Sequence, residues 1–414
     1  MTLTLRKPLA ALLAALPLLL GACTGAKMLG NPESPYPPPR APVVGDILHL
    51  ATGTYVSEEA MLAAVTGPRI VYVGETHDNP ASHRLEVTVL KAMSERHPGR
   101  VALGMEMFSP AMQETLDSWL AGDLDDKTFL KKTRFDQSWN FDQYKGLLLF
   151  AKRNAIPIVA LNAEKELRMA VSRTEFADLP EEQRAQLPEI DMNDPYQKAM
   201  AEAVFAGHDG GEAMRGGFLR VQTLWDETMA ESIVRFLKDR PDDDWRMVVV
   251  AGGNHIRHGY GIPRRVFRRL PVSYTSVGSR EIEIPEEKMA RFMKVKVPDF
   301  PMPAYDYQVM TRYESLEMER VKLGVMLKEE DGKVLAKMVM PDSNGARSGL
   351  EKGDVLVSFD GVAIEDSFDL IYEVKQKRPG DGGTLVIERE GEEMSLEVTF
   401  EKDAGQGHHQ GMKK

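Results

Sequence analysis

Ionisable and polar side chains follow four apolar runs of this sequence, at the points where the runs end. The first run ends in Val-Gly-Glu-Thr-His-Asp-Asn at residues 73–79, and the fourth ends in Ala-Gly-Gly-Asn-His at residues 251–255. If these runs are parallel strands, their carboxyl ends share one edge of a sheet and form a ligand crevice there. The side chains expected to converge in that crevice are Glu75, His77, Glu106, Asn162, Asn254 and His255.

One chemistry that suits these residue types is hydrolysis. His77, His255 and Glu75 offer the ligand atoms that a divalent metal takes, and Glu106 adds a carboxylate for general acid–base work. In this reading Glu75, His77, Glu106 and His255 are the catalytic residues. The sequence contains neither HExxH nor GxSxG, which excludes the common zinc-protease and serine-hydrolase classes.

The other chemistry is iron ligation. Haem iron accepts His or Tyr as an axial ligand, and Tyr260, His258 and His255 lie within six residues of one another. The remaining polar groups of this stretch that could contact haem are Asn254, Arg257 and Arg264, the arginines through its propionates. Gly74 to His77 and Gly252 to His255 repeat a Gly-x-x-His spacing, and their glycines allow the backbone to approach a ligand closely.

The elements that must position these residues alternate between strand-like and helix-like. Alternation of continuous apolar strands with helices predicts an α/β fold with a mainly parallel sheet covered on both faces. The predicted strands are 69–73, 101–107, 156–161, 247–251 and 272–277, and the predicted helices are 81–97, 110–121, 141–154 and 218–239.

Several further residues take positions in this arrangement. Residues 168–217 are predicted to form a small helical cap over the sheet edge, with His208 in one of its loops. On the helix at 218–239, Trp225 is expected in the core, and Asp226 is expected to point into the crevice and orient a histidine. His83 is predicted to be solvated on a surface helix.

Composition sets the class of the protein. The chain has 414 residues, which suggests two or three domains, and 43% of them are hydrophobic. A net charge of −11 provides no basic footprint for general nucleic-acid binding. One cysteine, Cys23, rules out an intrachain disulfide and any multi-cysteine metal site.

The N-terminus has the pattern of an export signal. Arg6 and Lys7 precede a short apolar run that ends in Leu-Gly-Ala-Cys at residues 20–23. This resembles a bacterial lipobox, which implies that residues 1–22 are cleaved and that Cys23 is acylated and anchors the protein to a membrane. Thr24 follows the cysteine, a pattern similar to that of outer-membrane lipoproteins facing the periplasm in Gram-negative bacteria. Residues 23–42 are rich in proline and are expected to form a tether.

The motif set of the first domain resembles the ChaN family of haem-binding, iron-regulated bacterial lipoproteins. The resemblance rests on residues 73–79, on Gln-Thr-Leu-Trp-Asp-Glu-Thr-Met-Ala at 222–230, and on Gly-Gly-Asn-His-Ile-Arg-His-Gly-Tyr-Gly-Ile-Pro at 252–263. It implies haem held at a homodimer interface with a tyrosine ligand, for which Tyr260 is the choice here, and a role in iron uptake. The wider superfamily resembles Tiki-type metalloproteases and erythromycin esterases, so binder and hydrolase both stay open.

A second resemblance covers the C-terminal part. Lys-Leu-Gly-Val at 322–325, Asp-Ser-Asn-Gly-Ala-Arg-Ser-Gly-Leu at 342–350 and Phe-Asp-Gly-Val at 359–362 are similar to a PDZ domain of the HtrA-like kind. This resemblance implies a small, mainly β domain whose Leu323, Gly324 and Val325 bind the C-terminal carboxylate of an envelope protein. Leu370 is expected to line the peptide groove, on a helix that begins near Ser367.

The predicted organisation is therefore a signal peptide, a tether and two domains. The ChaN-like domain spans 43–283, a proline-rich linker 284–312, the PDZ domain 313–402 and a disordered tail 403–414.

Overall fold

A computed structural model describes residues 36–206, 212–240, 244–289, 298–316 and 320–402. The expected acylation at Cys23, the signal segment, His208 and the C-terminal tail lie outside these ranges. Within them, no helix has both the length and the apolar character needed to cross a bilayer. The chain separates into two compact units, one made of residues 1–113 with 144–314 and the other of 114–143 with 315–414.

The first unit is built on an eight-stranded sheet with the order β2-β1-β8-β7-β3-β6-β4-β5. Six neighbouring strands, from β8 to β5, run parallel, whereas β1 pairs antiparallel with β2 and β8. The expected α/β class is confirmed. The strands are β1 (Ile47–His49), β2 (Thr54–Val56), β3 (Ile70–Glu75), β4 (Val101–Met105), β5 (Ile158–Ala160), β6 (Arg246–Gly252), β7 (Tyr274–Glu283) and β8 (Tyr307–Arg312).

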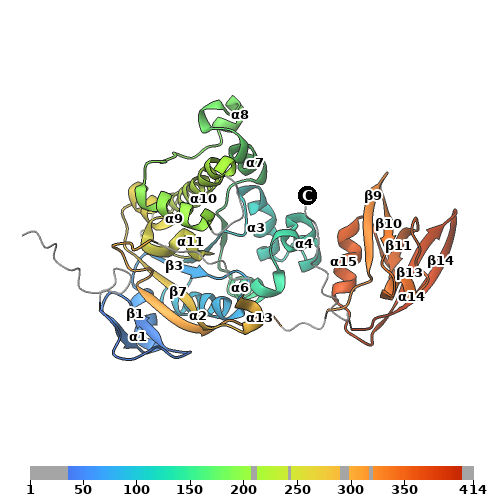
Figure 1. Cartoon of the computed structure of the whole chain (residues 1–414), viewed down its shortest axis with the longest axis horizontal. Helices are drawn as coiled ribbons and strands as arrows, with labels where there is room; N and C mark the ends of the chain where they lie inside the picture. The colour runs from blue at the N-terminus through green and yellow to red at the C-terminus, as the bar shows by residue number, and fades with distance from the viewer. Residues whose placement is uncertain (1–35, 207–211, 241–243, 290–297, 317–319, 403–414) are drawn as a thin grey trace, which may run out of the picture. The chain divides into compact units, whose positions relative to one another are not determined.

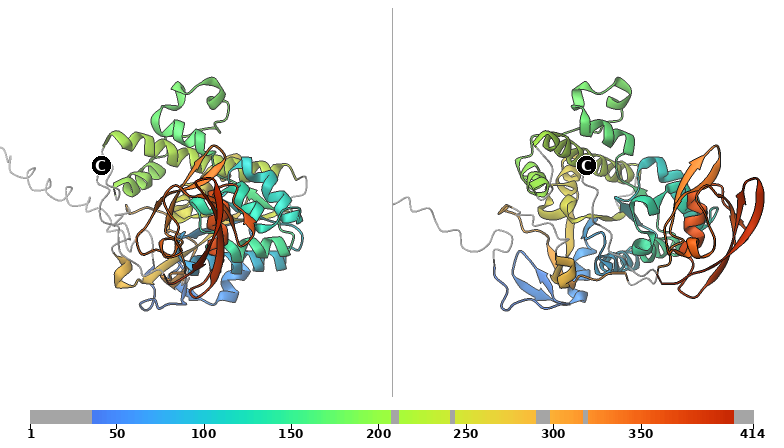
Figure 2. Two further views of the ribbon diagram at one scale, coloured as in Figure 1. Left: turned by 90° about the vertical axis from the view of Figure 1, so that its right-hand side faces the viewer. Right: turned by 45° about the vertical axis from the view of Figure 1, so that its right-hand side comes forward.

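Helices cover both faces of this sheet (Figure 1 and Figure 2). On one face α2 (Pro80–Arg96) packs against β3 and β6, and it begins where the Asn79 side chain accepts a hydrogen bond from the Ala81 N–H. On the other face α10 (Glu212–Lys238) and α12 (Ile262–Arg269) bury apolar side chains against the strands. The remaining helices of this unit are α1 (Glu58–Val65), α6 (Phe141–Arg153), α7 (Lys165–Arg173), α8 (Glu181–Arg184), α9 (Pro195–Ala206), α11 (Gly253–Ile256) and α13 (Glu286–Met289).

The predicted cap is helical, and its helices α7 and α9 pack on α10. Leu167 and Val171 of α7 join Leu224 of α10 in one apolar cluster. The helix predicted from residue 218 begins earlier, at Glu212, so α10 extends from the sheet into the cap.

The second half of the predicted linker at 284–312 contains strand β8 and buried residues. β8 pairs with β7 on one side and with β1 on the other, and Phe300 and Tyr305 are buried. The prolines that suggested a linker lie before this strand. The first unit also continues past β8, because the Tyr313 hydroxyl donates a hydrogen bond to Asp78 at 2.7 Å.

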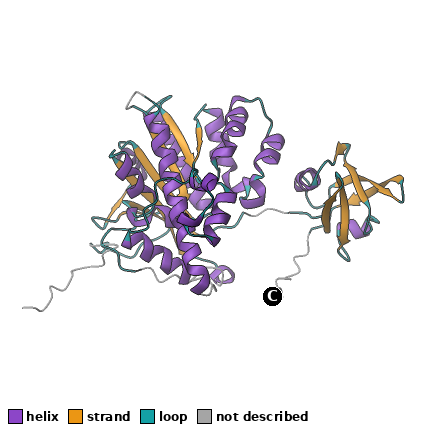
Figure 3. Cartoon of the chain, turned by 90° about the horizontal axis from the view of Figure 1, so that it is seen from above, coloured by secondary structure: helices purple, strands orange, loops and turns teal. Residues whose placement is uncertain are grey.

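The second unit contains a mainly antiparallel sheet with the order β14-β13-β11-β10-β9. Figure 3 shows its strands in orange and its helices in purple. Helix α15 (Ser367–Lys375) lies against β9 and β11, and Phe359 and Phe400 are fully buried in the core. The strands are β9 (Val325–Glu330), β10 (Lys333–Val339), β11 (Val355–Phe359), β12 (Val362–Ala363), β13 (Gly382–Arg389) and β14 (Glu392–Thr399), and the other helices are α3 (Gln113–Ala121), α4 (Asp126–Thr133), α5 (Phe135–Ser138) and α14 (Asn344–Arg347).

Candidate functional site

The carboxyl ends of β3, β4 and β6 bring together three of the side chains that the sequence singled out. Glu75 of β3 lies opposite Gly252 of β6 in the parallel register. Glu106 follows β4, and its Oε2 accepts a hydrogen bond from the Gly252 N–H at 2.7 Å. His255 lies one turn beyond Gly252, in α11. Three separate strands therefore deliver carboxylate and imidazole groups to one place.

His77 is held by Glu75. Its Nδ1 donates to Glu75 Oε1 at 2.6 Å, and the Tyr144 hydroxyl donates to the same oxygen at 2.8 Å. Burial disfavours the charged imidazole, but the hydrogen bond and charge of Glu75 outweigh it and raise the pKa of His77 to about 9. The Glu75 carboxylate is fully buried, and its hydrogen bonds with His77 and His83 overcome that burial and hold its pKa well below the usual range.

His255 is held in the same way by another carboxylate. Its Nδ1 donates to Asp226 Oδ1 of α10 at 2.6 Å, so the expected role of Asp226 in orienting a histidine is confirmed. Its Nε2 lies 3.7 Å from Glu106 Oε1. Burial opposes charging, but the negative charges of Glu106 and Asp226 raise the pKa of His255. Trp225 is only partly buried and presents its ring edge-on to this imidazole.

His255 therefore presents Nε2 toward Glu106, and His77 Nε2 lies beside Gly252, whose N–H binds the same carboxylate. A Cβ at residue 252 would lie 2.8 Å from His77 Nε2 and 3.5 Å from Glu106 Oε2, so only glycine leaves room for the ring. With each Nδ1 bonded to a carboxylate, the neutral form of each ring carries its lone pair on Nε2. Two such nitrogens beside one carboxylate form a donor set suited to a metal or to proton transfer.

A third histidine lies behind Glu75, and the prediction that it is solvated is wrong. His83 is 5% exposed; its Nε2 donates to the His77 carbonyl at 3.1 Å, and its Nδ1 lies 3.1 Å from Glu75 Oε2. Glu86, also buried, lies 3.2 Å from the same Nδ1. The ligand atoms of Glu75, His83 and Glu86 are close enough together to hold a metal ion. The His-x-x-Glu spacing on one helix face was the sequence signal for this pair.

The glycines at the strand ends have a different role from the one expected. The ring of buried Tyr305 fills the space beside Gly74, Gly253 and Gly278, where a Cβ would lie 2.3–2.8 Å from its atoms. Burial raises the pKa of Tyr305 to about 12, so its phenol is neutral. A side chain of the same protein therefore occupies the space that these glycines leave open.

Tyr260 and His258 lie in an aromatic cluster of their own. Tyr260 is 7% exposed, stacks on Tyr196 of α9 with ring centroids 4.8 Å apart, and packs against Phe300. His258 stacks on Tyr260, and its Nδ1 donates to the Met302 carbonyl at 2.8 Å. Burial raises the pKa of Tyr260.

The other predicted haem contacts differ in their surroundings. Asn254 is exposed and Arg257 is partly exposed. The Arg264 guanidinium forms ion pairs with Asp194 at 3.2 Å and Asp191 at 3.4 Å. Asn162 is buried, and its side-chain oxygen accepts the N–H of Ala163 at 2.8 Å.

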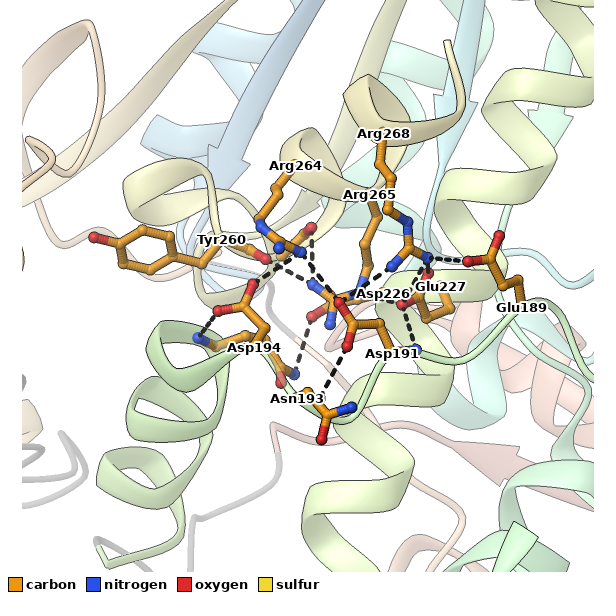
Figure 4. A network of polar contacts seen from close by, with 12 residues as sticks. Glu189, Asp191, Asn193, Asp194, Asp226, Glu227, Tyr260, Arg264, Arg265 and Arg268 are labelled. Carbon is orange, nitrogen blue, oxygen red and sulfur yellow. Dashed lines mark hydrogen bonds and ion pairs between the residues drawn. The ribbon is translucent and has the colours of Figure 1, made fainter. Parts of the chain in front are cut away.

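A buried ion-pair network joins the aromatic cluster to the helix that carries Asp226 (Figure 4). Glu227, the next residue of α10, is fully buried and pairs with Arg265 at 3.1 Å, Arg268 at 3.2 Å and Arg269 at 2.7 Å. The Arg265 guanidinium, itself fully buried, donates to the Tyr260 carbonyl at 2.6 Å. The network fixes α12 against α10 and thereby fixes the backbone at both Asp226 and Tyr260.

In the second unit, a groove of about 370 Å³ lies between β9 and α15. Leu323, Gly324, Val325 and Leu370 all line it, so the structure brings the four predicted peptide-binding residues together. Gly324 has φ +76°, and a Cβ there would lie 2.2 Å from Ser343 Cβ, so the loop requires glycine.

Comparisons with known proteins find similarities for two segments of the chain. Residues 61–266 match the family described as haem-binding uptake, Tiki superfamily, ChaN, and residues 321–400 match the PDZ domain family. Among solved structures, ChaN of Campylobacter jejuni, described with cofacial haem binding, superposes with a TM-score of 0.50 at 15% identity, covering 65% of this chain and 97% of that one. At that identity the likeness establishes the fold alone.

The remaining similarities concern the PDZ segment. Probable periplasmic serine endoproteases, DegP-like, from Marinomonas sp. (strain MWYL1) and Pseudomonas fulva (strain 12-X) are 28% and 39% identical over 97 and 70 residues. These matches cover 20% and 17% of this chain and only 21% and 15% of the relatives. The HtrA-type protease AlgW with a decapeptide matches at 26% identity with a TM-score of 0.19, over 20% of this chain and 29% of that one.

Proposed function

We propose that this chain, which joins a domain of the ChaN haem-binding family to a PDZ domain, is a haem-binding lipoprotein of the Gram-negative outer membrane that serves haem or iron uptake. The match of residues 61–266 to that family carries the proposal. The PDZ domain docks the C-terminal segment of an envelope protein, and two copies of the chain hold haem between them.

The residues around Tyr260 fit a porphyrin chemically. A phenol and an imidazole, the two ligand types that haem iron accepts, stack together among Phe300, Met200 and Phe218. His258 donates through Nδ1, which in the neutral ring leaves the lone pair on Nε2. Tyr196, which stacks on Tyr260, is itself 45% exposed. Bound haem would supply a redox-active iron, and the protein would supply the axial ligand and the apolar surroundings.

A haemin titration of the full chain tests this assignment. We expect a saturable Soret shift, and a different spectrum in Tyr260→Phe or His258→Ala because each change removes a candidate iron ligand. Tyr274→Phe is the matched control, since that tyrosine packs against Tyr72 and Phe267 instead of the Tyr260 cluster. An unchanged spectrum at excess haemin would contradict haem binding, and identical spectra for all variants would place the ligand elsewhere.

The membrane anchor is supported by the lipobox-like sequence that ends at Cys23. We expect Cys23→Ser to release the protein into the periplasm or to leave it unprocessed in the inner membrane. Fractionation with the outer membrane as before would contradict acylation at this residue.

Peptide docking is supported by the PDZ match and by the groove between β9 and α15. Backbone N–H groups at Leu323–Val325 would bind a free carboxylate, so the free acid of a C-terminal peptide should bind more tightly than its amide. Fluorescence polarisation measures both affinities. Gly324→Val should abolish the difference, because the loop cannot keep its left-handed backbone.

A second candidate function is metal-dependent hydrolysis, and one observation favours it. His77 and His255 are each held at Nδ1 by a buried carboxylate, and His255 turns Nε2 toward Glu106. Such carboxylate–histidine pairs commonly support metal ligands. A bound divalent ion would supply a Lewis acid, with Glu106 positioned to accept a proton.

Calorimetric titration with Zn²⁺ or Mn²⁺ separates the two candidates. The hydrolase hypothesis predicts binding that His77→Ala and His255→Ala both abolish. His97→Ala is the control, since that imidazole contacts the Thr66 carbonyl at the far end of α2. Absence of metal binding in the unaltered protein would eliminate this candidate and leave haem binding untouched.

A further inference from the structure

The two ends of the PDZ groove carry opposite charges. Arg320, Lys322 and Lys375 line the end at the Leu323–Val325 loop, where Lys375 also pairs with Asp136 and Asp142. At the other end Glu329 of β9 accepts a hydrogen bond from the Ser367 N–H, at the start of α15, at 2.9 Å. The hydrogen bonds with Ser367 and, to a smaller extent, the charge of Arg134 lower the pKa of Glu329, so the side chain is an anion at neutral pH.

Strand geometry places Glu329 on the groove side of β9. Successive side chains of a strand point to opposite faces, and Val325 and Leu327 both line the groove. Glu329 continues that series, whereas Glu330 points the other way and pairs with Lys328 at 2.7 Å. The hydrogen bond of Glu329 to the first residue of α15 independently places its carboxylate between the strand and the helix.

The strand is also available for pairing. In the described part of the chain β9 is the edge of its sheet, with β10 on one side only. A peptide that adds as an antiparallel strand places its last residue opposite Val325, its third-from-last opposite Leu327 and its fifth-from-last opposite Glu329. The side chains of these three peptide residues share one face and point into the groove.

We propose that this groove selects a free C-terminal segment with an apolar last residue and a Lys or Arg at the fifth position from the end. The inference rests on the proposed function of the PDZ domain and names the partner class that it docks. The apolar walls, formed by Leu323, Leu370 and Val374 among others, receive the last side chain. The cation-lined end matches the terminal carboxylate, and Glu329 matches the basic residue. An acidic residue at that position would face a like charge.

The test uses the full chain and fluorescent six-residue peptides that end in a free valine. One peptide has Lys at the fifth position from the end, a second has Glu there, and the remaining positions are Ala or Ser. The Lys peptide should bind about 2- to 5-fold more tightly, as expected for an exposed ion pair, and the difference should shrink at high salt. Glu329→Lys should reverse the order.

Two further variants make the test specific to the charge of Glu329. Glu329→Gln keeps an acceptor for the Ser367 N–H and should remove the preference without weakening the Glu peptide. Glu330→Lys makes the same charge change on the opposite face and should leave the order unchanged. The same order in the unaltered protein and in Glu329→Lys, or equal affinities for both peptides in the unaltered protein, would overturn the charge selection.

The amide form of the Lys peptide distinguishes this failure from failure of the proposed function. If the amide and the free acid bind equally, the groove does not read a carboxylate and PDZ docking of C-termini is wrong. If the free acid binds more tightly but Lys and Glu are not distinguished, docking stands and only the charge selection is wrong. If no peptide binds, both are wrong.

Discussion

At the scale of single residues, the first unit holds two histidines by the same carboxylate–imidazole arrangement. A histidine with two free nitrogens can adopt either tautomer and several ring orientations. Glu75 and Asp226 remove that freedom by binding Nδ1 of His77 and His255 at 2.6 Å each. Nε2 of His255 then faces Glu106 at 3.7 Å, and Nε2 of His77 lies beside Gly252 on the neighbouring strand. Whatever ligand this site takes, its donors are oriented before the ligand arrives.

The pKa of His77 provides the first prediction. Because the hydrogen bond to Glu75 raises it to about 9, well above about 6.5 for an unperturbed histidine, His77 stabilises the fold fully below pH 6.5. This stabilisation is lost as the pH rises through about 9. NMR titration of the His77 ring should show the raised value, and Glu75→Gln should bring it down. A midpoint that stays near 9 in Glu75→Gln would contradict the assigned cause.

Gly252→Ala is the second prediction. The new Cβ would lie 2.8 Å from His77 Nε2, so the ring must leave its position and its bond to Glu75 must weaken. We expect a loss of about 1–3 kcal/mol in the free energy of unfolding, together with a lower His77 pKa. Gly146→Ala in α6 is the control, since its Cβ would meet only Val87 at 3.9 Å and should be neutral or mildly stabilising. Equal effects of the two substitutions in urea unfolding would contradict the crowding argument.

At the scale of elements, the sequence predicts strands and helices that show a regular apolar pattern. It does not predict features that depend on pairing between distant segments. Apolar runs that end in Glu75, Glu106 and His255 identify strands and their functional edge, because the local pattern and the topology agree. His83 was misplaced because an amphipathic helix shows which residues share a face, but not whether a second polar residue such as Glu86 is buried with them. β8 was missed because it is a short strand that follows several prolines, and its partners β1 and β7 come from distant parts of the chain.

The contact between α10 and α12 supports the third prediction. Glu227 is fully buried with three arginines around it, and removing its charge leaves Arg265 buried without a counter-ion. Glu227→Gln should therefore cost about 3–5 kcal/mol in urea unfolding. Glu231→Gln, one turn further along α10, breaks only the exposed pair with Arg235 and should cost about 0.5 kcal/mol or less. Similar costs for the two variants would show that the network contributes little.

At the scale of the whole molecule, the last strand of the first unit lies beside its first strand. β8 lies between β1, from the beginning of the unit, and β7, near its end. Segment 298–312 also brings in Tyr305, which fills the space beside the strand-end glycines, and Phe300, which packs on Tyr260. The first unit therefore extends beyond residue 283, and both of its candidate sites depend on segments from that region.

Two truncations test this boundary as the fourth prediction. A fragment of residues 36–316 keeps β8 and should unfold cooperatively in a thermal melt followed by circular dichroism. A fragment of residues 36–283 ends where the sequence suggested that the domain ends, and it loses the strand between β1 and β7. It also loses the buried Phe300, Tyr305 and Met310. Each loss of a large buried side chain costs about 2–5 kcal/mol, so together they approach the whole stability of a typical domain of about 5–15 kcal/mol. We therefore expect the shorter fragment to be unfolded or aggregated in gel filtration, whereas a cooperative melt at the same temperature as the longer fragment would show that β8 is dispensable.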